Sequence, residues 1–217
     1  MARNAHPEVT RRRILDAAQN LFAERGYEHT SIQNIVDALG DLSKGAIYHH
    51  FASKEAILEA LTERDNDAHS AAIRAIVDDK QLDALHKVRM ILRYSLTDAG
   101  HAKVTRAVEP LLDDPMTFSS YMRFWREQLP QTWLQLIDEG AADGSIVTQY
   151  PREAAQLLAM LLNYWLFPHF YPASKAEYRH RVQCLATMME AIDMPLFDDE
   201  LVELMVNSAI GACESDK

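Results

Sequence analysis

The chain is poor in residues that interrupt helices and in residues that cross-link small secreted proteins. Its 217 residues include only seven glycines, eight prolines and two cysteines. So few glycines and prolines favour long helices over a series of short strands and turns. Cys184 and Cys213 form neither a disulfide framework nor a zinc-binding pattern, so we expect a protein of the reducing cytoplasm.

Long hydrophobic runs are also missing. The most apolar stretch, LLAMLLNYWLF at 157–167, is shorter than the roughly 20 residues that span a bilayer, and it contains Asn163. We predict that it forms a buried helix. The N-terminal sequence MARNAHPEVTRRR leads into no apolar segment, so we expect neither a secretory signal nor a membrane partner.

The chain lacks the overall basic charge that is typical of nucleic-acid-binding proteins. Its formal net charge is −10, but the charge is unevenly distributed. Residues 1–60 hold seven basic and eight acidic residues, whereas the remainder holds 15 basic and 24 acidic ones. This asymmetry indicates two modules with different partners. For the basic cluster Arg11–Arg13, contact with a phosphate backbone and a simple exposed helix face are equally open.

What is abundant is helical periodicity. Apolar residues recur at three- and four-residue spacing from the first turns onward, beginning with Ile14, Leu15, Ala18, Leu21 and Phe22. No segment alternates as a strand does. We therefore predict an all-α fold with about nine or ten helices, at 10–25, 31–39, 43–50, from 53 into the seventies, and at 82–98, 101–112, 116–140, 152–168, 174–192 and 199–212.

Local signals mark several helix ends. Thr30 with Gln33, and Ser174 with Glu177, have the spacing of capping boxes. Pro130 is expected to kink or split the segment 116–140.

Two short helices joined by a tight turn, after a longer first helix, predict a helix-turn-helix. In the segment 43–50, Ile47 and Phe51 share one helical face, and we expect them to pack inward. Lys44, Tyr48 and His49 lie on the other side. Lysine supplies positive charge, the tyrosine hydroxyl donates to a phosphate oxygen, and the N-terminal N–H groups of helices add further phosphate donors.

The adjacent histidines His49 and His50 suggest a metal pair at first sight. Neighbouring residues on a helix point about 100° apart, and no further ligands stand at suitable spacing. We therefore predict no metal and no cofactor. His49 lies on the exposed side with Lys44 and Tyr48, and we expect it to contact DNA.

ILDAAQNLFAERGYEHTSIQNIV followed by SKGAIYHHFASKEAIL resembles the DNA-binding domain of the TetR/AcrR family of bacterial transcriptional regulators. The resemblance covers residues 10 to about 60. It implies a helix-turn-helix domain at 1–55, a ligand-binding and dimerisation domain at 56–217, and a homodimer that leaves a palindromic operator when a small-molecule effector binds. It also implies that His50 supports the turn beside Phe51 and that a set of residues contacts DNA, namely Ser31, Gln33, Lys44, Gly45, Ala46, Tyr48, His49 and Lys54. Ser43 joins this set because it is the expected N-cap of the helix 43–50, whose first N–H groups can donate to phosphate.

The turn departs from the family pattern. Gly40-Asp41-Leu42-Ser43 has one residue more than usual, and Asp41 brings a negative charge near the expected DNA face. We expect the angle of the recognition helix to differ from that of its relatives.

The C-terminal part is rich in aromatic residues, which suit either an apolar ligand pocket or an ordinary core. The candidate ligand-binding residues, chosen from their helix positions, are Met90, Tyr94, Trp125, Trp133, Asn163 and Tyr164. The broad apolar faces of 152–168 and 174–192 fit the four-helix dimer interface that the resemblance implies.

Three other functions compete with a ligand-responsive repressor. An all-α enzyme is disfavoured because no nucleophile–base pair, HExxH motif or phosphate-binding loop is present. A ligand-independent DNA-binding protein predicts a small or basic C-terminal part, whereas this one is long and acidic. A transcriptional activator is compatible with every feature of the sequence.

Overall fold

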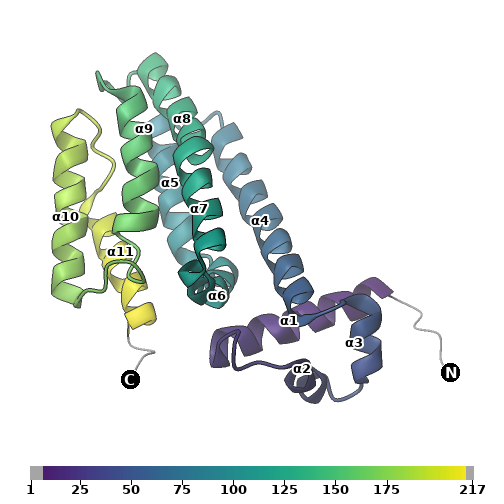
Figure 1. The fold of residues 1–217 in the computed structure, drawn as a ribbon. Coiled ribbons are helices and arrows are strands. Elements are labelled where there is room, and N and C mark those ends of the chain that lie inside the picture. Colours follow the sequence, from purple (N-terminus) through teal and green to yellow (C-terminus); the bar gives the residue numbers. More distant parts are fainter. Residues whose placement is uncertain (1–6, 214–217) are drawn as a thin grey trace. The chain divides into compact units, whose positions relative to one another are not determined.

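The predicted all-α class is confirmed. In the computed structural model, which describes residues 7–213 (side chains of 7–209), the described chain is helical and contains no strand (Figure 1). Two short non-α segments occur, the 3-10 turn η1 and the π-helical segment η2. The elements are α1 (Pro7–Arg25), α2 (Ile32–Leu39), α3 (Lys44–His50), α4 (Lys54–Asp78), α5 (Ala84–Thr97), α6 (Ala99–Val108), η1 (Glu109–Asp113), α7 (Pro115–Glu127), α8 (Leu129–Asp143), α9 (Pro151–Met160), η2 (Leu161–Trp165), α10 (Lys175–Ala191) and α11 (Asp199–Cys213).

The helix between 116 and 140 is split, as Pro130 predicts. The chain leaves α7 at Gln128 and re-enters a helix at Leu129, with the proline in the first turn of α8. A proline is tolerated there because the first N–H groups of a helix have no intrahelical partner. Because of this break, the described residues form eleven α-helices, whereas about nine or ten were predicted.

The chain divides into two compact units. Unit 1 comprises the chain up to Ala71 together with Ala99–Pro110, and unit 2 comprises Ala72–Asp98 and the chain from Leu111 onward. The predicted functional boundary at residues 55 and 56 lies inside unit 1, because most of α4 and the whole of α6 belong to that unit. The division of functions between 1–55 and 56–217 remains a prediction.

Unit 1 is built on a small apolar core. The predicted inward face of α1 is confirmed, since its apolar residues are buried, and Phe22 makes an edge-to-face contact with Tyr27 at 5.2 Å between ring centroids. Each of α2, α3 and α4 adds isoleucine or leucine side chains to this core. The largest fully buried side chains of this core are Ile14, Leu15, Phe22, Ile35, Ile47, Ile57 and Leu61.

Helix α6 joins unit 1 through polar contacts. The imidazole of His101 lies 2.7 Å from the Asp65 carboxylate and stacks on His69 at 4.1 Å between ring centroids. Lys103 donates to the side chain of Asn20 on α1 at 2.9 Å. Together with the buried side chains of Val104 and Ala107, these contacts hold α6 against α1 and α4.

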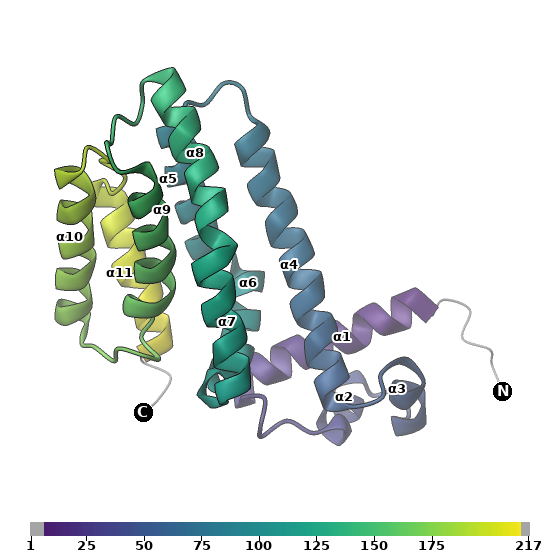
Figure 2. The same cartoon turned by 45° about the horizontal axis from the view of Figure 1, so that its top comes forward.

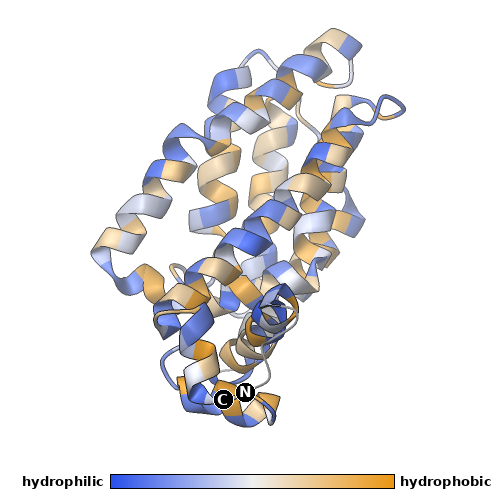
Figure 3. Ribbon diagram, turned by 90° about the vertical axis from the view of Figure 1, so that its right-hand side faces the viewer, coloured by the Kyte–Doolittle hydropathy of each residue, from blue (hydrophilic) through white to orange (hydrophobic). Residues whose placement is uncertain are grey.

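Unit 2 contains the larger core. Helices α5, α8, α9, α10 and α11 supply most of it, and α9 and α10 run side by side in two views (Figures 1 and 2). The helices carry both hydrophobic and hydrophilic stretches (Figure 3), as expected of helices that bury one face. The close packing is clearest at Gly140, where an added Cβ would lie 2.7 Å from Ile146. The fully buried Lys87 reaches Glu139 at 2.5 Å.

The apolar stretch 157–167 differs in part from the single buried helix that was predicted. It begins in α9, becomes π-helical over Leu161–Trp165, and ends in an irregular segment. Leu158 and Leu166 are buried, whereas Leu157 is exposed. Asn163 donates to the carbonyl of Ala159 at 2.9 Å, so its amide is satisfied within the turn. Among the described residues, no helix is long and apolar enough to cross a membrane.

Candidate nucleic-acid interface

The second helix begins one residue later than the sequence indicates. The capping box predicted for Thr30 and Gln33 is wrong: Ser31 is the N-cap, accepting from the N–H of Asn34, whose side chain accepts from the N–H of Ser31. Thr30 is buried, and its hydroxyl donates to the Gly26 carbonyl at 2.8 Å. The Thr30 hydroxyl is therefore bound at the end of α1, and the next residue, Ser31, caps α2 instead. The capping box at Ser174 and Glu177 is confirmed.

The turn between α2 and α3 is set by its first and last residues. Gly40 has a φ of 73°, the left-handed conformation that ends a helix and that glycine adopts without strain. Ser43 accepts from the N–H of Ala46 and begins α3, as predicted. Leu42 is half-buried, while Asp41 is exposed.

The recognition helix α3 shows the two faces that its spacing predicts. Ile47 is completely buried and Phe51 nearly so. Lys44, Tyr48 and His49 are exposed, with 48% of Tyr48 accessible to solvent. An exposed tyrosine next to a lysine leaves a hydroxyl and an ammonium group available to a partner.

The structure brings most of the predicted DNA-binding residues onto α2, α3 and their N-caps, which pack against each other. Ser31, Gln33, Ser43 and Gly45 are exposed like the three side chains above, and Ala46 is half-buried. Gln33 donates to Asp37 at 2.8 Å. Their contact with DNA remains a prediction.

Lys54 differs from the rest of the predicted set. Its ammonium group donates to the carbonyl oxygen of Tyr27 at 2.8 Å and lies 4.0 Å from the centre of the Tyr27 ring. The Tyr27 phenol is itself buried and hydrogen-bonded to Glu55, and both effects raise its pKa. The start of α4 is thus fixed to the loop after α1.

His49 and His50 do not converge on one point. Their rings meet edge to face, with 5.4 Å between centroids and 78° between planes. His49 is exposed and His50 half-buried, which agrees with separate surroundings for the two residues.

The basic cluster of α1 makes contacts that the sequence did not reveal. Arg13 forms two hydrogen bonds to Asp41, of 2.6 and 2.9 Å. The guanidinium carbon of Arg11 lies 5.2 Å from the centre of the Phe51 ring. In the sequence, only their opposite charges could have suggested that Arg13 and Asp41 pair, because 28 residues separate them.

The candidate ligand residues of unit 2 fall into separate surroundings. Trp125 and Tyr164 both contact Phe170, with ring centroids 6.2 and 4.8 Å apart, in an aromatic cluster. Met90 is 43% exposed on α5. Tyr94, one turn further along α5, donates to Asp98 at 2.9 Å.

Trp133 belongs to the buried core of unit 2. Among the described residues, its indole N–H is the only fully buried side-chain polar atom without a hydrogen-bond partner. An indole N–H can only donate, so this group lacks an acceptor.

A helix-turn-helix with one buried and one exposed face, followed by a larger helical unit, is the construction of modular DNA-binding regulators. Comparisons with known proteins agree. The family model described as bacterial regulatory proteins, tetR family, matches residues 14–61. The transcriptional repressor KstR2 of Rhodococcus jostii is 30% identical over 151 residues, which cover 67% of this chain and 72% of KstR2. The chain belongs to the TetR family of transcriptional regulators.

Solved structures show the same fold. GusR of Salmonella enterica has a TM-score of 0.62 at 23% identity, covering 88% of this chain and 98% of GusR. The ketosteroid transcriptional regulator KstR2 of Mycobacterium tuberculosis has a TM-score of 0.52 at 22% identity, covering 85% and 95%. As a member of this family, the chain is a transcriptional regulator rather than an enzyme.

Proposed function

We propose that the protein is a homodimeric transcriptional repressor of the cytoplasm that binds a palindromic operator and leaves it when a small molecule binds unit 2. The observation that carries the proposal is the exposed face of α3, where Lys44, Tyr48 and His49 are accessible while Ile47 is buried. Lys44 supplies charge, Tyr48 donates to a phosphate, and Gly45 permits close approach of the backbone.

The DNA face is tested by Lys44→Ala combined with Tyr48→Phe. We expect operator affinity to fall at least tenfold, and its salt dependence to weaken by about one in the log–log slope, because one phosphate contact is lost with the lysine. Fluorescence anisotropy with a duplex selected from a random library by the wild-type protein measures both. Lys80→Ala, an exposed lysine of unit 2, is the matched control. Unchanged affinity of the double variant would remove α3 from the interface.

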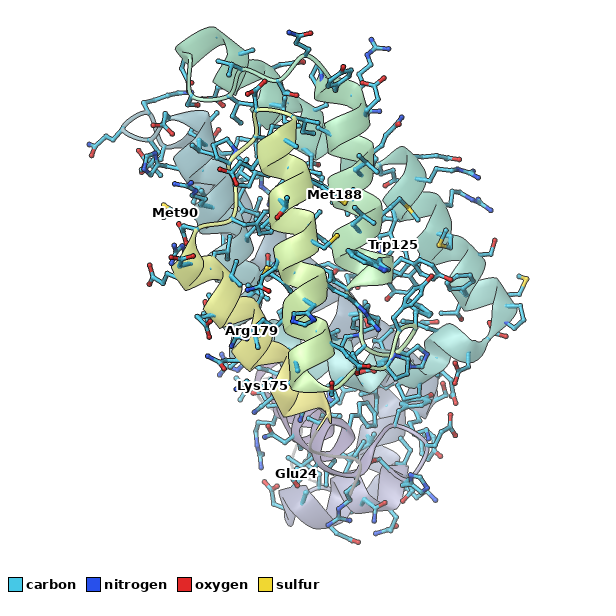
Figure 4. The ribbon with its side chains drawn as sticks, turned by 90° about the vertical axis from the view of Figure 1, so that its left-hand side faces the viewer. Glu24, Met90, Trp125, Lys175, Arg179 and Met188 are labelled. Atoms are coloured by element: carbon cyan, nitrogen blue, oxygen red, sulfur yellow. The ribbon has the colours of Figure 1, made fainter. Side chains whose placement is uncertain are left out.

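The homodimer is supported by apolar side chains left exposed on α9 and α10. Leu157 is 38% and Met188 40% exposed, and Figure 4 shows Met188 on the outer face of α10. Two recognition helices must lie about 34–36 Å apart to read successive turns of a duplex, which a dimer provides. Sedimentation should show a dimer at micromolar concentration. Leu157→Glu with Met188→Glu should give monomers that bind the operator weakly, and a monomeric wild-type protein would contradict the proposal.

The effector is proposed to bind unit 2 beside Trp133, one of the six predicted residues. The unpaired indole N–H of Trp133 supports this, because a buried donor costs about 1–3 kcal/mol when unsatisfied and a ligand acceptor would satisfy it. Since one structural neighbour is a ketosteroid regulator, steroid ketones are the first compounds to assay by operator release. A compound that releases wild-type protein should act less well on Trp133→Phe, and equal action on both would exclude this tryptophan.

Release would follow from a shift between two conformations. An effector that favours a spacing of the recognition helices unsuited to the operator lowers DNA affinity by its differential affinity for the two states. A reporter gene behind the selected operator separates the repressor from the activator. Deleting the regulator should raise expression, whereas lower expression would identify an activator.

A further inference from the structure

The turn before α3 has one additional residue, and its Asp41 places a carboxylate beside the proposed DNA face. Arg13 of α1 binds this carboxylate. Arg13 Nη2 donates to Asp41 Oδ1 at 2.6 Å, and Nη1 donates to Oδ2 at 2.9 Å. Two parallel hydrogen bonds are the strongest geometry available to an arginine and a carboxylate, and they fix orientation as well as distance. These hydrogen bonds hold the pKa of Asp41 below its ordinary value.

The same helix also holds the other end of α3. Arg11 lies over the ring of Phe51, the C-cap of α3, at 5.2 Å from the ring centre. Asp41 comes before Ser43, the N-cap, and Phe51 closes the last turn. Two arginines of α1 therefore contact the chain just before and just after the recognition helix.

We propose that Arg13 and Asp41 form a positioning pair, which sets the turn before α3 and neutralises Asp41, and that Arg13 does not bind phosphate. The proposal rests on the proposed function of α3 as the DNA-contacting helix. Were Arg13 to bind phosphate, it would either release the Asp41 carboxylate or bring the phosphate close to it, and in both cases like charges would repel beside the DNA backbone.

The two roles predict opposite effects for Asp41→Ala. A positioning pair predicts weaker operator binding, because the turn loses its tie to α1. A phosphate-binding Arg13 predicts tighter binding, because removal of Asp41 frees the arginine and removes a negative charge.

The experiment measures operator affinity by anisotropy across a series of salt concentrations, with the duplex selected by the wild-type protein. Arg13→Gln and Asp41→Ala should each weaken binding about 3- to 10-fold, a modest loss because 42% and 59% of the two side chains are exposed. Combining them should cost no more than either alone, since both remove one interaction. The slope of log affinity against log salt should stay that of the wild type.

The charge-reversed variant, Arg13→Asp with Asp41→Arg, should recover most of the lost affinity. Arg12→Gln removes the same charge from the neighbouring, exposed position and corrects for net charge. Melting temperatures check that every variant is folded.

Four outcomes would overturn the proposal: wild-type affinity of the Arg13 and Asp41 variants, tighter binding by Asp41→Ala, a slope reduced by about one in Arg13→Gln, which indicates a lost phosphate contact, or no recovery of affinity in the reversed pair. Lys44→Ala, assayed in parallel, tests the proposed function separately. If Lys44→Ala binds normally, α3 is not the DNA-contacting helix. If only the Arg13 and Asp41 variants bind normally, the positioning pair alone is refuted.

Discussion

Two glycines inside helices occupy opposite environments. An added Cβ at Gly45 meets only Ser43 Oγ, at 3.8 Å, an ordinary contact. Gly45→Ala should therefore raise the free energy of unfolding by about 0.5–1 kcal/mol, because alanine loses less backbone entropy on folding. If α3 approaches DNA closely at this position, the same variant should bind the operator several-fold more weakly. A stabilised protein with wild-type affinity would show that DNA stays away from Gly45.

Gly140 provides the contrasting case. Its added Cβ would lie 2.7 Å from both Cβ and Cγ1 of Ile146, atoms too close to the backbone to move freely. We expect Gly140→Ala to lower the free energy of unfolding by about 1–3 kcal/mol through overpacking. Urea denaturation of the two glycine variants side by side measures changes of opposite sign. Equal stabilisation in both would mean that the α8 turn relaxes without cost.

At the scale of elements, the buried lysine of α5 links that helix to α8. Lys87 is fully buried and pairs with Glu139, whose side chain is 37% exposed. Lys87→Ala should lower the free energy of unfolding by about 2–4 kcal/mol, mainly because removal of the aliphatic stem leaves a cavity. Lys87→Met fills that space and leaves Glu139 to water, so its cost should stay within about 1.5 kcal/mol. Denaturant midpoints compare the two, and equal losses would assign the effect to the charge rather than to packing.

Helix boundaries can be predicted from the sequence where a single residue determines them. Pro130 separates α7 from α8, because proline lacks an N–H group and fits only in the first turn of a helix. Gly40 ends α2, because glycine adopts the left-handed conformation without strain. The N-cap of α2 could not be predicted from the sequence, because Thr30 has the chemistry of a cap but is buried by the end of α1. Periodicity likewise placed Ile47 inward and Tyr48 outward on α3.

Contacts between distant segments were beyond sequence reasoning. Nothing local marks Arg13 as the partner of Asp41, or Lys54 as that of Tyr27. The open question about Arg11–Arg13 arose because a free and a paired arginine read the same in sequence. The ligand residues of unit 2 stay predictions for a related reason, since aromatic side chains suit a core as well as a pocket.

For the whole molecule, acid should weaken the fold through helix caps. The carboxylates of Asp83, Asp114 and Glu177 each accept from a backbone N–H at the start of a helix, which lowers their pKa values. A lowered folded-state pKa gives stability that is complete above the unfolded value, about 4, and is lost as the pH falls through the folded value. Urea midpoints should therefore be steady near neutrality and fall below about pH 4.

Asp83→Asn is the matched variant for this prediction. It keeps an oxygen that can accept at the N-cap but does not titrate, so its loss of stability in acid should be shallower than that of the wild type. Identical acid profiles would exclude the α5 cap as a contributor.

The π-helical turn at Leu161–Trp165 limits which mutations unit 2 tolerates. A π turn is an α-helix that has accommodated one surplus residue. Removing one residue there would restore α-helical winding and turn the side chains within the segment by about 100° around the helix axis. The aromatic cluster around Phe170 depends on that count, because Tyr164 lies within the turn and Phe170 beyond it. Unit 2 should thus accept many substitutions in this turn, but not a change in its length.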